Sequence, residues 1–315
     1  MSDRLGDALR AACGDGRVRR NAPLAPLTTF RVGGPADWLV DVRSGQEMRR
    51  IISLPLLAGT AITVLGGGSN VLVADEGIGG IVLRVHGGEV ASPDPLHVRA
   101  DAGVTINGLV RWTISHGRAG LEAWAGTPGT VGGAIHGNAH FKGRFIAETL
   151  DRVTLATRGG EILDVPAREM GFGYDDSRLH RTREIVVDAL FEVGPGEPAE
   201  LRATARESLA FRKRTQPLES PSAGCIFQNP DPARDLVPEG IPASAGALVD
   251  RAGLKGASVG GAMVSTTHAN FIVNRGAASA ADIRVLIERC KREVRGQFGI
   301  ELREEIIYLG FDTAR

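Results

Sequence analysis

Glycine gathered in two stretches constrains the fold of this chain more than any other feature of the sequence. The chain has 42 glycines among 315 residues, about 13% and roughly twice the usual share. The first stretch, Leu65-Gly66-Gly67-Gly68-Ser69-Asn70, leads into a second apolar segment rather than a helix. It therefore departs from the dinucleotide-binding fingerprint, whose glycines open a helix. Consecutive glycines let backbone N–H groups converge on an anion such as a diphosphate; the alternative is a simple hairpin turn.

The second stretch reads Gly126-Thr127-Pro128-Gly129-Thr130-Val131-Gly132-Gly133. Glycine at this density suits backbone that packs directly against a flat, phosphate-bearing cofactor. A tight crossing of two backbone segments is the alternative, but two such stretches in one chain favour the cofactor. His136 and His140 follow four residues apart, yet the glycines around them argue against a helix that presents both to an ion. We therefore expect no metal site.

Charge and composition exclude several classes of protein. Lys plus Arg and Asp plus Glu both number 37, so the net charge is zero, which argues against a nucleic-acid or membrane-surface protein. Residues 1–20 contain no apolar stretch of the kind found in a signal peptide. The longest uncharged stretches are broken by small and polar residues, so no membrane span is expected. The three cysteines form no CxxC pair, which favours a reducing cytoplasm.

The pattern of apolar residues predicts an α+β protein. A cluster of chain breakers at residues 194–198 marks a domain boundary. Before it, Ser44 with Glu47 resembles a capping box that opens a helix. Further helices are expected at 105–116, at 199–214 and from Ser279 onward, where an apolar face recurs at helical spacing. Strands are expected at 61–65, 71–73, 80–85 and 300–309.

Two side chains stand out as chemical candidates. Cys225 lies between a glycine and a loop that ends in Asn-Pro, a setting that argues against a small core residue. Cys290 lies on an apolar helical face and is expected in the core, whereas Cys13 is expected at the surface or in a terminal segment. The last predicted strand carries Glu304 and Glu305 before two apolar residues. A carboxylate at the edge of a buried strand should be paired or have a raised pKa, but alternation alone does not choose between them.

Taken together, these segments resemble the UDP-N-acetylenolpyruvoylglucosamine reductase family of the MurB type. The first glycine stretch, continued by Val71-Leu72, and the second, continued by Ala134, resemble the family's two FAD loops. The segment Ser222-Ala223-Gly224-Cys225-Ile226-Phe227-Gln228-Asn229-Pro230, with Gln216-Pro217 upstream, resembles its catalytic segment. His268-Ala269-Asn270-Phe271-Ile272-Val273-Asn274 and Glu305 also fit. The motifs follow in order from about residue 21 to residue 310, so the resemblance covers nearly the whole chain.

The resemblance implies a PCMH-type FAD-binding fold of two α+β subdomains plus a smaller α+β substrate-binding domain. It places the FAD-binding domain at residues 21–195, with its subdomains dividing near residue 88. The substrate-binding domain would span residues 199–298. A C-terminal strand within residues 299–315 would return to the FAD-binding part, and residues 1–20 would form an extension or helix.

The resemblance also implies a function in peptidoglycan synthesis, and so in cell shape and division. NADPH would reduce FAD, and the reduced flavin would pass a hydride to the enolpyruvyl ether of a UDP-sugar, giving UDP-N-acetylmuramate. The protein would be a cytoplasmic monomer without nucleic-acid or membrane partners. Its FAD-binding residues would be those of the two loops: Gly66, Gly67, Gly68, Ser69, Asn70, Gly126, Thr127, Pro128, Gly129, Thr130, Gly132 and Gly133.

Four residues acquire implied roles at the substrate. Cys225 would be the proton donor, where many members carry serine; a thiol with a pKa near ~8.5 is mostly protonated at neutral pH. Glu305 would assist protonation or orient the intermediate. Lys213 and Asn229 would contact the substrate, since a lysine suits a carboxylate or phosphate as a compact cation. The run 212–214 could instead be a solvated helix end, and His268 could bind substrate or cap its own loop.

Two positions depart from the family pattern. The family has an arginine after Tyr174, which helps to stabilise the enolate, whereas this chain has Asp175. An aspartate there would be unfavourable beside developing negative charge. Either Arg178 substitutes, or Lys213 and a neighbouring arginine do so, or turnover is impaired and the chain is a flavin-binding relative; a PCMH-fold oxidoreductase with another substrate is a further alternative. The second departure is Asn138-Ala139-His140, where the family usually has another glycine.

Overall fold

The computed structural model describes residues 2–57 and 59–311 and divides the chain into two compact units. The first unit consists of Met1–Ala22, Asp37–Gly67 and Gly80–Phe211. The second unit consists of Pro23–Ala36, Gly68–Gly79 and Arg212–Arg315. Two segments from the N-terminal third therefore belong with the C-terminal part, and the main division falls after residue 211 rather than at the breaker cluster 194–198.

A mixed sheet forms one part of the first unit. Its strand order is β1 (Val18–Pro23), β2 (Pro35–Val42), β5 (Ile78–Val85) and β3 (Ile62–Leu65). Strands β3 and β5 run parallel. Helix α2 (Gly45–Ile52) begins at Ser44, whose hydroxyl accepts a hydrogen bond of 3.2 Å from the Glu47 N–H. Helix α1 (Ser2–Cys13) packs against α2, and Cys13 is buried there. Cys13 does lie in a terminal segment, the N-terminal helix α1, but it is not at the surface: its side chain is buried because α1 packs one face against α2.

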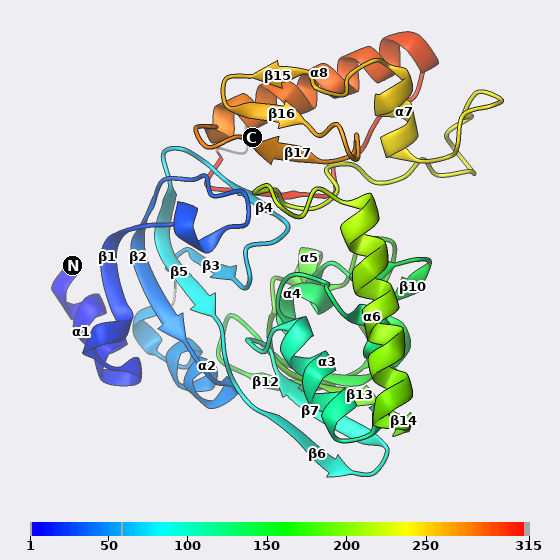
Figure 1. Ribbon diagram of the computed structural model, residues 1–315. Coiled ribbons are helices and arrows are strands. Elements are labelled where there is room, and N and C mark those ends of the chain that lie inside the picture. The colour runs from blue at the N-terminus through cyan, green and yellow to red at the C-terminus, as the bar shows by residue number, and fades with distance from the viewer. Residues whose placement is uncertain (1, 58, 312–315) are drawn as a thin grey trace. The chain divides into compact units, whose positions relative to one another are not determined.

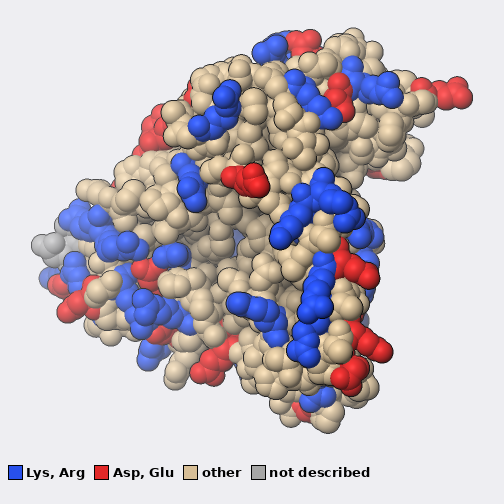
Figure 2. Space-filling model, viewed as in Figure 1, with Lys and Arg blue, Asp and Glu red and all other residues tan. Residues whose placement is uncertain are grey.

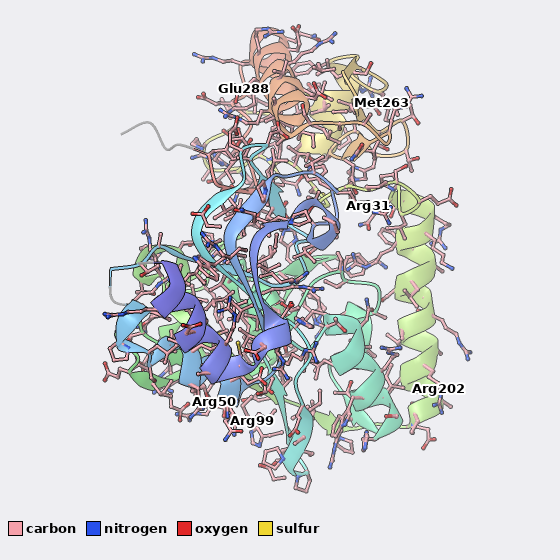
Figure 3. The ribbon with its side chains drawn as sticks, turned by 90° about the vertical axis from the view of Figure 1, so that its left-hand side faces the viewer. Arg31, Arg50, Arg99, Arg202, Met263 and Glu288 are labelled. Atoms are coloured by element: carbon pink, nitrogen blue, oxygen red, sulfur yellow. The ribbon has the colours of Figure 1, made fainter. Side chains whose placement is uncertain are left out.

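A second, antiparallel sheet completes the core of the first unit (Figure 1). Its order is β12 (Ile162–Pro166), β11 (Leu150–Ala156), β13 (Ile185–Glu192), β7 (His97–Asp101) and β6 (Val90–Asp94). Helix α4 (Val131–His136) packs on β13 and β7. Buried Asp188 of β13 accepts hydrogen bonds of 2.9 and 2.7 Å from Arg99 of β7, labelled in Figure 3. This bidentate pair balances a buried carboxylate inside the sheet.

Smaller elements finish the first unit. Helix α3 (Ile106–Ser115) begins at Thr105, and α5 (Leu179–Thr182) is a single turn. Short strand pairs are β8 (Arg118–Ala119) with β14 (Gly194–Pro195), and β9 (His140–Phe141) with β10 (Arg144–Phe145). Helix α6 (Pro198–Thr215) carries the chain to the second unit. Single 3-10 turns occur at Asp15–Arg17, Ala25–Leu27, Pro55–Leu57, Glu122–Trp124, Ile146–Thr149 and Ala167–Glu169.

The second unit has its own hydrophobic core. Helix α8 (Ala280–Phe298) lies along the antiparallel sheet of β15 (Ser258–Val259), β16 (Ala262–Val264) and β17 (Ile272–Asn274) (Figure 1). Helix α7 (Ala245–Arg251) packs against α8. Strand β18 (Ile307–Leu309) pairs in parallel with β4 (Val71–Val73), which directly follows the first glycine stretch. The predicted apolar face of α8 is buried, including Cys290, as expected.

The strands exclude one alternative left open by the sequence and correct one predicted range. The first glycine stretch is not a hairpin turn, because β3 pairs with β5 and β4 pairs with β18. The strand predicted over 300–309 is formed only at Ile307–Leu309. The residues before it form hydrogen bonds instead with the predicted catalytic segment around Cys225: the Gln228 N–H donates to the Arg303 carbonyl, at 2.8 Å. Among the described residues, no helix has the length and apolarity needed to cross a membrane.

Candidate active site

The two glycine stretches meet in the first unit. A Cβ atom on Gly67 would lie 2.7 Å from the Cα atom of Gly129, and one on Gly66 would overlap the Thr130 hydroxyl. Backbone therefore passes directly over backbone, which only residues without a side chain permit. The tight crossing considered from the sequence is real at these positions. It also places both predicted cofactor loops side by side, as a shared cofactor requires.

The second stretch is fixed by its neighbours. Thr130 is the N-cap of α4, with its hydroxyl accepting a hydrogen bond of 3.4 Å from the Gly133 N–H. Asn107 of α3 holds the beginning of the loop: its Oδ1 accepts from the Gly126 N–H at 2.7 Å, and its Nδ2 donates to the Thr127 carbonyl at 3.2 Å. Sequence reasoning missed Asn107, because nothing in a helical pattern shows that one asparagine reaches back to a loop.

The end of the first stretch belongs to the second unit. Gly68 has a φ of +62°, and a Cβ atom there would overlap the Leu27 carbonyl. Asn70 donates a hydrogen bond of 3.1 Å from Nδ2 to the carbonyl of Glu305, and the Ile307 N–H donates to the Asn70 carbonyl at 3.0 Å. The predicted cofactor residue Asn70 thus fixes the backbone that carries the predicted catalytic carboxylate.

The two predicted catalytic residues lie on neighbouring backbone segments of the second unit. The Glu305 N–H donates a hydrogen bond of 2.8 Å to the carbonyl of Ile226, the residue after Cys225. Phe227 and Glu304 form an isolated antiparallel bridge. Cys225 is half-buried, forms no disulfide and follows Gly224, whose φ is +78°. The structure therefore brings together two positions that are 80 residues apart in the sequence.

Asn270 holds this catalytic segment in place and was not assigned a role from the sequence. Its Oδ1 accepts from the Phe227 N–H at 2.9 Å, and its Nδ2 donates to the Phe227 carbonyl at 2.8 Å. Its own carbonyl accepts from the Ile226 N–H at 2.8 Å. Asn270 is itself buried. It therefore acts as a clamp that fixes the two residues after Cys225.

The three basic residues at the end of α6, 212–214, differ in their exposure to solvent. Figure 2 shows Lys and Arg side chains along this helix, and Lys213 and Arg214 are exposed. Arg212 is buried, and burial lowers its pKa to about 10, while the charge of Cys225 as a thiolate acts in the opposite direction. A guanidinium that interacts with a thiol favours the thiolate, which is the product of proton donation. The sequence offered an arginine next to Lys213 only as a possible substitute cation and did not single out Arg212.

The other predicted substrate contacts have local partners. Asn229 accepts a hydrogen bond of 3.1 Å from the Ala245 N–H at the start of α7. His268 accepts one of 3.2 Å at Nδ1 from the Asn270 N–H, so it caps its own loop, and burial lowers its pKa. A loop-capping role for His268 is therefore observed, and both residues also position neighbouring backbone.

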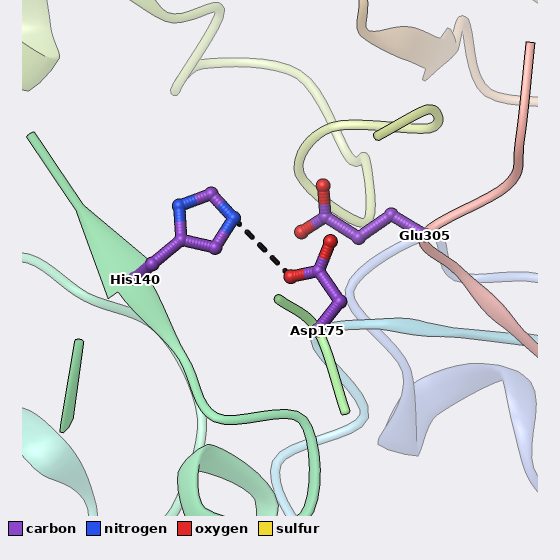
Figure 4. A group of neighbouring side chains, drawn as sticks. All are labelled: His140, Asp175 and Glu305. Carbon is purple, nitrogen blue, oxygen red and sulfur yellow. Dashed lines mark ion pairs between the residues drawn. The ribbon is translucent and has the colours of Figure 1, made fainter. Parts of the chain in front are cut away.

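The two departures from the family pattern lie together in the first unit. His140 Nε2 is 3.2 Å from Asp175 Oδ1 (Figure 4). Glu305, drawn in the same view, belongs to the second unit. Arg178, which was considered as a substitute cation, makes two hydrogen bonds of 2.9 Å to Glu184. Its charge is already engaged by a partly buried carboxylate.

Comparison with known proteins identifies the family. Residues 216–309 match the model of the UDP-N-acetylenolpyruvoylglucosamine reductase C-terminal domain, and residues 36–166 match that of an FAD-binding domain. A UDP-N-acetylenolpyruvoylglucosamine reductase of Synechococcus sp. (strain WH7803) is 40% identical over 304 residues, which cover 95% of each chain. That of Carboxydothermus hydrogenoformans is 38% identical over 296 residues, covering 93% of this chain and 94% of the relative.

The chain belongs to this reductase family. The crystal structure of UDP-N-acetylenolpyruvylglucosamine reductase (MurB) from Thermus caldophilus supports the assignment. Its TM-score is 0.76 at 35% identity, with 93% of this chain and 99% of that chain covered. The fold is α+β with a PCMH-type FAD-binding part, as the sequence predicted. The glycines of both stretches lie within the residues matched by the FAD-binding model.

Proposed function

We propose that this protein is the FAD-dependent reductase that converts UDP-N-acetyl-3-O-(1-carboxyvinyl)glucosamine to UDP-N-acetylmuramate, with NADPH as the source of hydride. Family membership over nearly the whole chain carries the proposal. The backbone bond between residue 226 and Glu305 supports it, because it joins the segments of the proton donor and the assisting carboxylate.

The chemistry assigns a separate task to each site residue. FAD, when bound, supplies the hydride that it has taken from NADPH. Hydride addition to the terminal carbon of the enol ether forms a C–H bond, and the π electrons move toward the substrate carboxylate as an enolate. Positive charge nearby lowers the energy of that intermediate. The Cys225 thiol then donates its proton to the adjacent carbon, and its S–H electron pair remains on the thiolate.

Four further residues of the second unit take part in the proposed reaction. Arg212 favours the thiolate that proton donation leaves on Cys225. Asn270 fixes the backbone after Cys225 through three hydrogen bonds. We assign Glu305 to orienting the intermediate or assisting its protonation, and exposed Lys213 to binding a negatively charged part of the substrate.

We extend the proposal to the setting of the enzyme. A cytoplasmic location suits three cysteines that form no disulfide, since Cys225 must remain a thiol to donate its proton. A net charge of zero gives no general attraction to nucleic acid or anionic membranes. We therefore propose that the enzyme works as a monomer on small molecules alone.

An anaerobic assay tests this function. NADPH should bleach the flavin absorbance of the purified protein, and the enolpyruvyl UDP-sugar should then restore it and yield UDP-N-acetylmuramate. A chain that has lost turnover would be bleached but not restored. A PCMH-fold oxidoreductase of another specificity would respond to neither the enolpyruvyl sugar nor its product. A protein that takes up no FAD would contradict the proposal entirely.

A further inference from the structure

A groove of about 630 Å³ lies between helices α3 and α6 of the first unit. On each helix its lining residues recur at spacings of three and four, so one face of each helix forms a wall. These residues lie at 107–115 on α3 and at 202–209 on α6, and Ala125 and Gly126 line the groove from the loop after α3. The volume is that of a small-molecule site, since such sites measure roughly 300–1,000 Å³.

The floor of this α3–α6 groove is apolar. Val110 and Ile114 of α3 and Ala205 of α6 are buried and line it, and Leu209 at its edge is 39% exposed. A flat apolar ring that lay on this floor would remove apolar surface from water. An inorganic anion would leave the floor in contact with water, so the groove favours an occupant that has an apolar ring as well as charge.

The rim of the groove carries three exposed arginines, Arg111, Arg202 and Arg206, of which Arg202 is labelled in Figure 3. Within the part of the chain that the structure describes, none of the three forms an ion pair with a carboxylate. Arg202 and Arg206 are neighbours on α6 because they lie four residues apart, so their charges repel. The acidic residues of the same helix, Glu200 and Glu207, do not line the groove. The groove therefore presents three uncompensated guanidinium groups, which suit phosphate oxygens.

Asn107 connects the groove with the second glycine stretch. It lines the groove from α3, and its side chain holds the loop through the Gly126 N–H at 2.7 Å and the Thr127 carbonyl at 3.2 Å. Gly129, over which the first glycine stretch passes, does not line the groove. A ligand in the groove would therefore contact the support of the loop without occupying the crossing of the two stretches.

We propose that the α3–α6 groove is a regulatory site that binds a nucleotide, apart from the site for FAD. The base lies on the apolar floor, and the phosphates lie between the three arginines. Adenine and uracil nucleotides share this chemistry, since both combine a flat ring with phosphate. The inference rests on the FAD loops of the proposed reductase and adds a ligand that the reaction does not consume.

Binding of the nucleotide should strengthen binding of FAD. The groove is formed in the conformation in which Asn107 holds Gly126 and Thr127, so a ligand that binds this conformation stabilises it. The coupling is reciprocal, because FAD must strengthen binding of the nucleotide by the same factor. We expect this factor to be at least about fivefold, the lower end of the range for coupled sites.

Calorimetric titration of the FAD-loaded enzyme tests the site, with ADP and UDP as probes in separate titrations. The double variant Arg202→Gln/Arg206→Gln should bind the preferred nucleotide at least about tenfold more weakly, the scale of one charge-assisted hydrogen bond. A nucleotide bound at the substrate site would not respond to this variant. Pyrophosphate, which has no ring for the apolar floor, should bind the wild type more weakly than the preferred nucleotide does.

The matched control is Arg50→Gln/Arg168→Gln, which removes the same charge from two exposed arginines of the first unit that do not line the groove. It should bind ADP and UDP as the wild type does. Equal affinity of the control and the groove variant would overturn the inference. Equal affinity of the wild type for pyrophosphate and for the nucleotide would also overturn it, because the groove would then be an anion-binding patch only.

Two further measurements separate this site from those of the reaction. In fluorescence titrations of the apoprotein, the nucleotide should raise the affinity for FAD in the wild type and not in the double variant; no rise in the wild type would overturn the regulatory role. A double variant that binds FAD poorly without nucleotide, or whose KM for NADPH rises, would assign the groove to FAD or NADPH and overturn a separate site. A wild-type protein that takes up no FAD would instead contradict the proposed reductase function.

Discussion

The thiol of Cys225, the proposed proton donor, is more acidic than the hydroxyl of a serine, and this difference in acidity determines the effect of replacing it. Cys225→Ser should retain at least part of the activity, because a hydroxyl can still donate a proton. Cys225→Ala should accept hydride but stall before protonation, with turnover lowered by about 10²- to 10⁴-fold. Stopped-flow absorbance separates the two steps, since flavin reoxidation reports hydride transfer and product release reports protonation. Full turnover by the alanine variant would remove Cys225 from the mechanism.

Asn270 shows how much one buried amide contributes to the catalytic segment. Asn270→Ala removes the partners of both backbone groups of Phe227, each worth about 1–3 kcal/mol when left buried and unsatisfied. We expect the free energy of unfolding to fall by on the order of 2–4 kcal/mol, measured by urea denaturation. Gln297→Ala is the control, because this exposed side chain makes a single bond of 3.4 Å. Its effect should stay within about 0.5 kcal/mol.

At the level of elements, the crossing of the two glycine stretches predicts which glycines tolerate a side chain. Gly67→Ala would place a methyl group 2.7 Å from the Gly129 Cα atom, so the loops must separate. We expect FAD affinity to fall at least tenfold, measured by fluorescence titration of the apoprotein. Gly159→Ala is the matched control, since its nearest neighbour would be 3.7 Å away. Equal FAD affinity of the two variants would contradict the role of the crossing.

The sequence predicted elements well where local chemistry determines them. Ser44 and Ser279 cap helices as expected, and α6 differs from its predicted range by one residue at each end. The strand predicted over 300–309 was too long, because tertiary hydrogen bonds to the catalytic segment replaced the sheet. For the site, the sequence predicted only residues that belong to recognisable motifs. Asn270 was given no role and Arg212 was not singled out from its neighbours, because their contacts join segments that are separated in the sequence.

At the scale of the whole molecule, His136 should make stability depend on pH. Burial, and then the charge of His180, lower its pKa from 6.5 to about 4. The unfolded chain therefore binds a proton at a higher pH than the folded chain does. The free energy of unfolding is therefore not reduced by His136 above about pH 6.5, and it falls as the pH is lowered toward 4. The decrease is at most about 3 kcal/mol, because the ring is partly exposed. His136→Gln should flatten this part of the curve of unfolding free energy against pH.

The pairing of β18 with β4 has a consequence for how the protein is made. Residues 68–79 leave the ribosome early, yet β4 finds its neighbour only when residues 307–309 have been translated. During most of its synthesis the nascent chain therefore exposes β4 without its hydrogen-bonding partner strand. Exposed strand edges promote aggregation and binding by chaperones. A message truncated shortly before codon 307 would yield a polypeptide with nearly all of its mass and no means of closing this sheet.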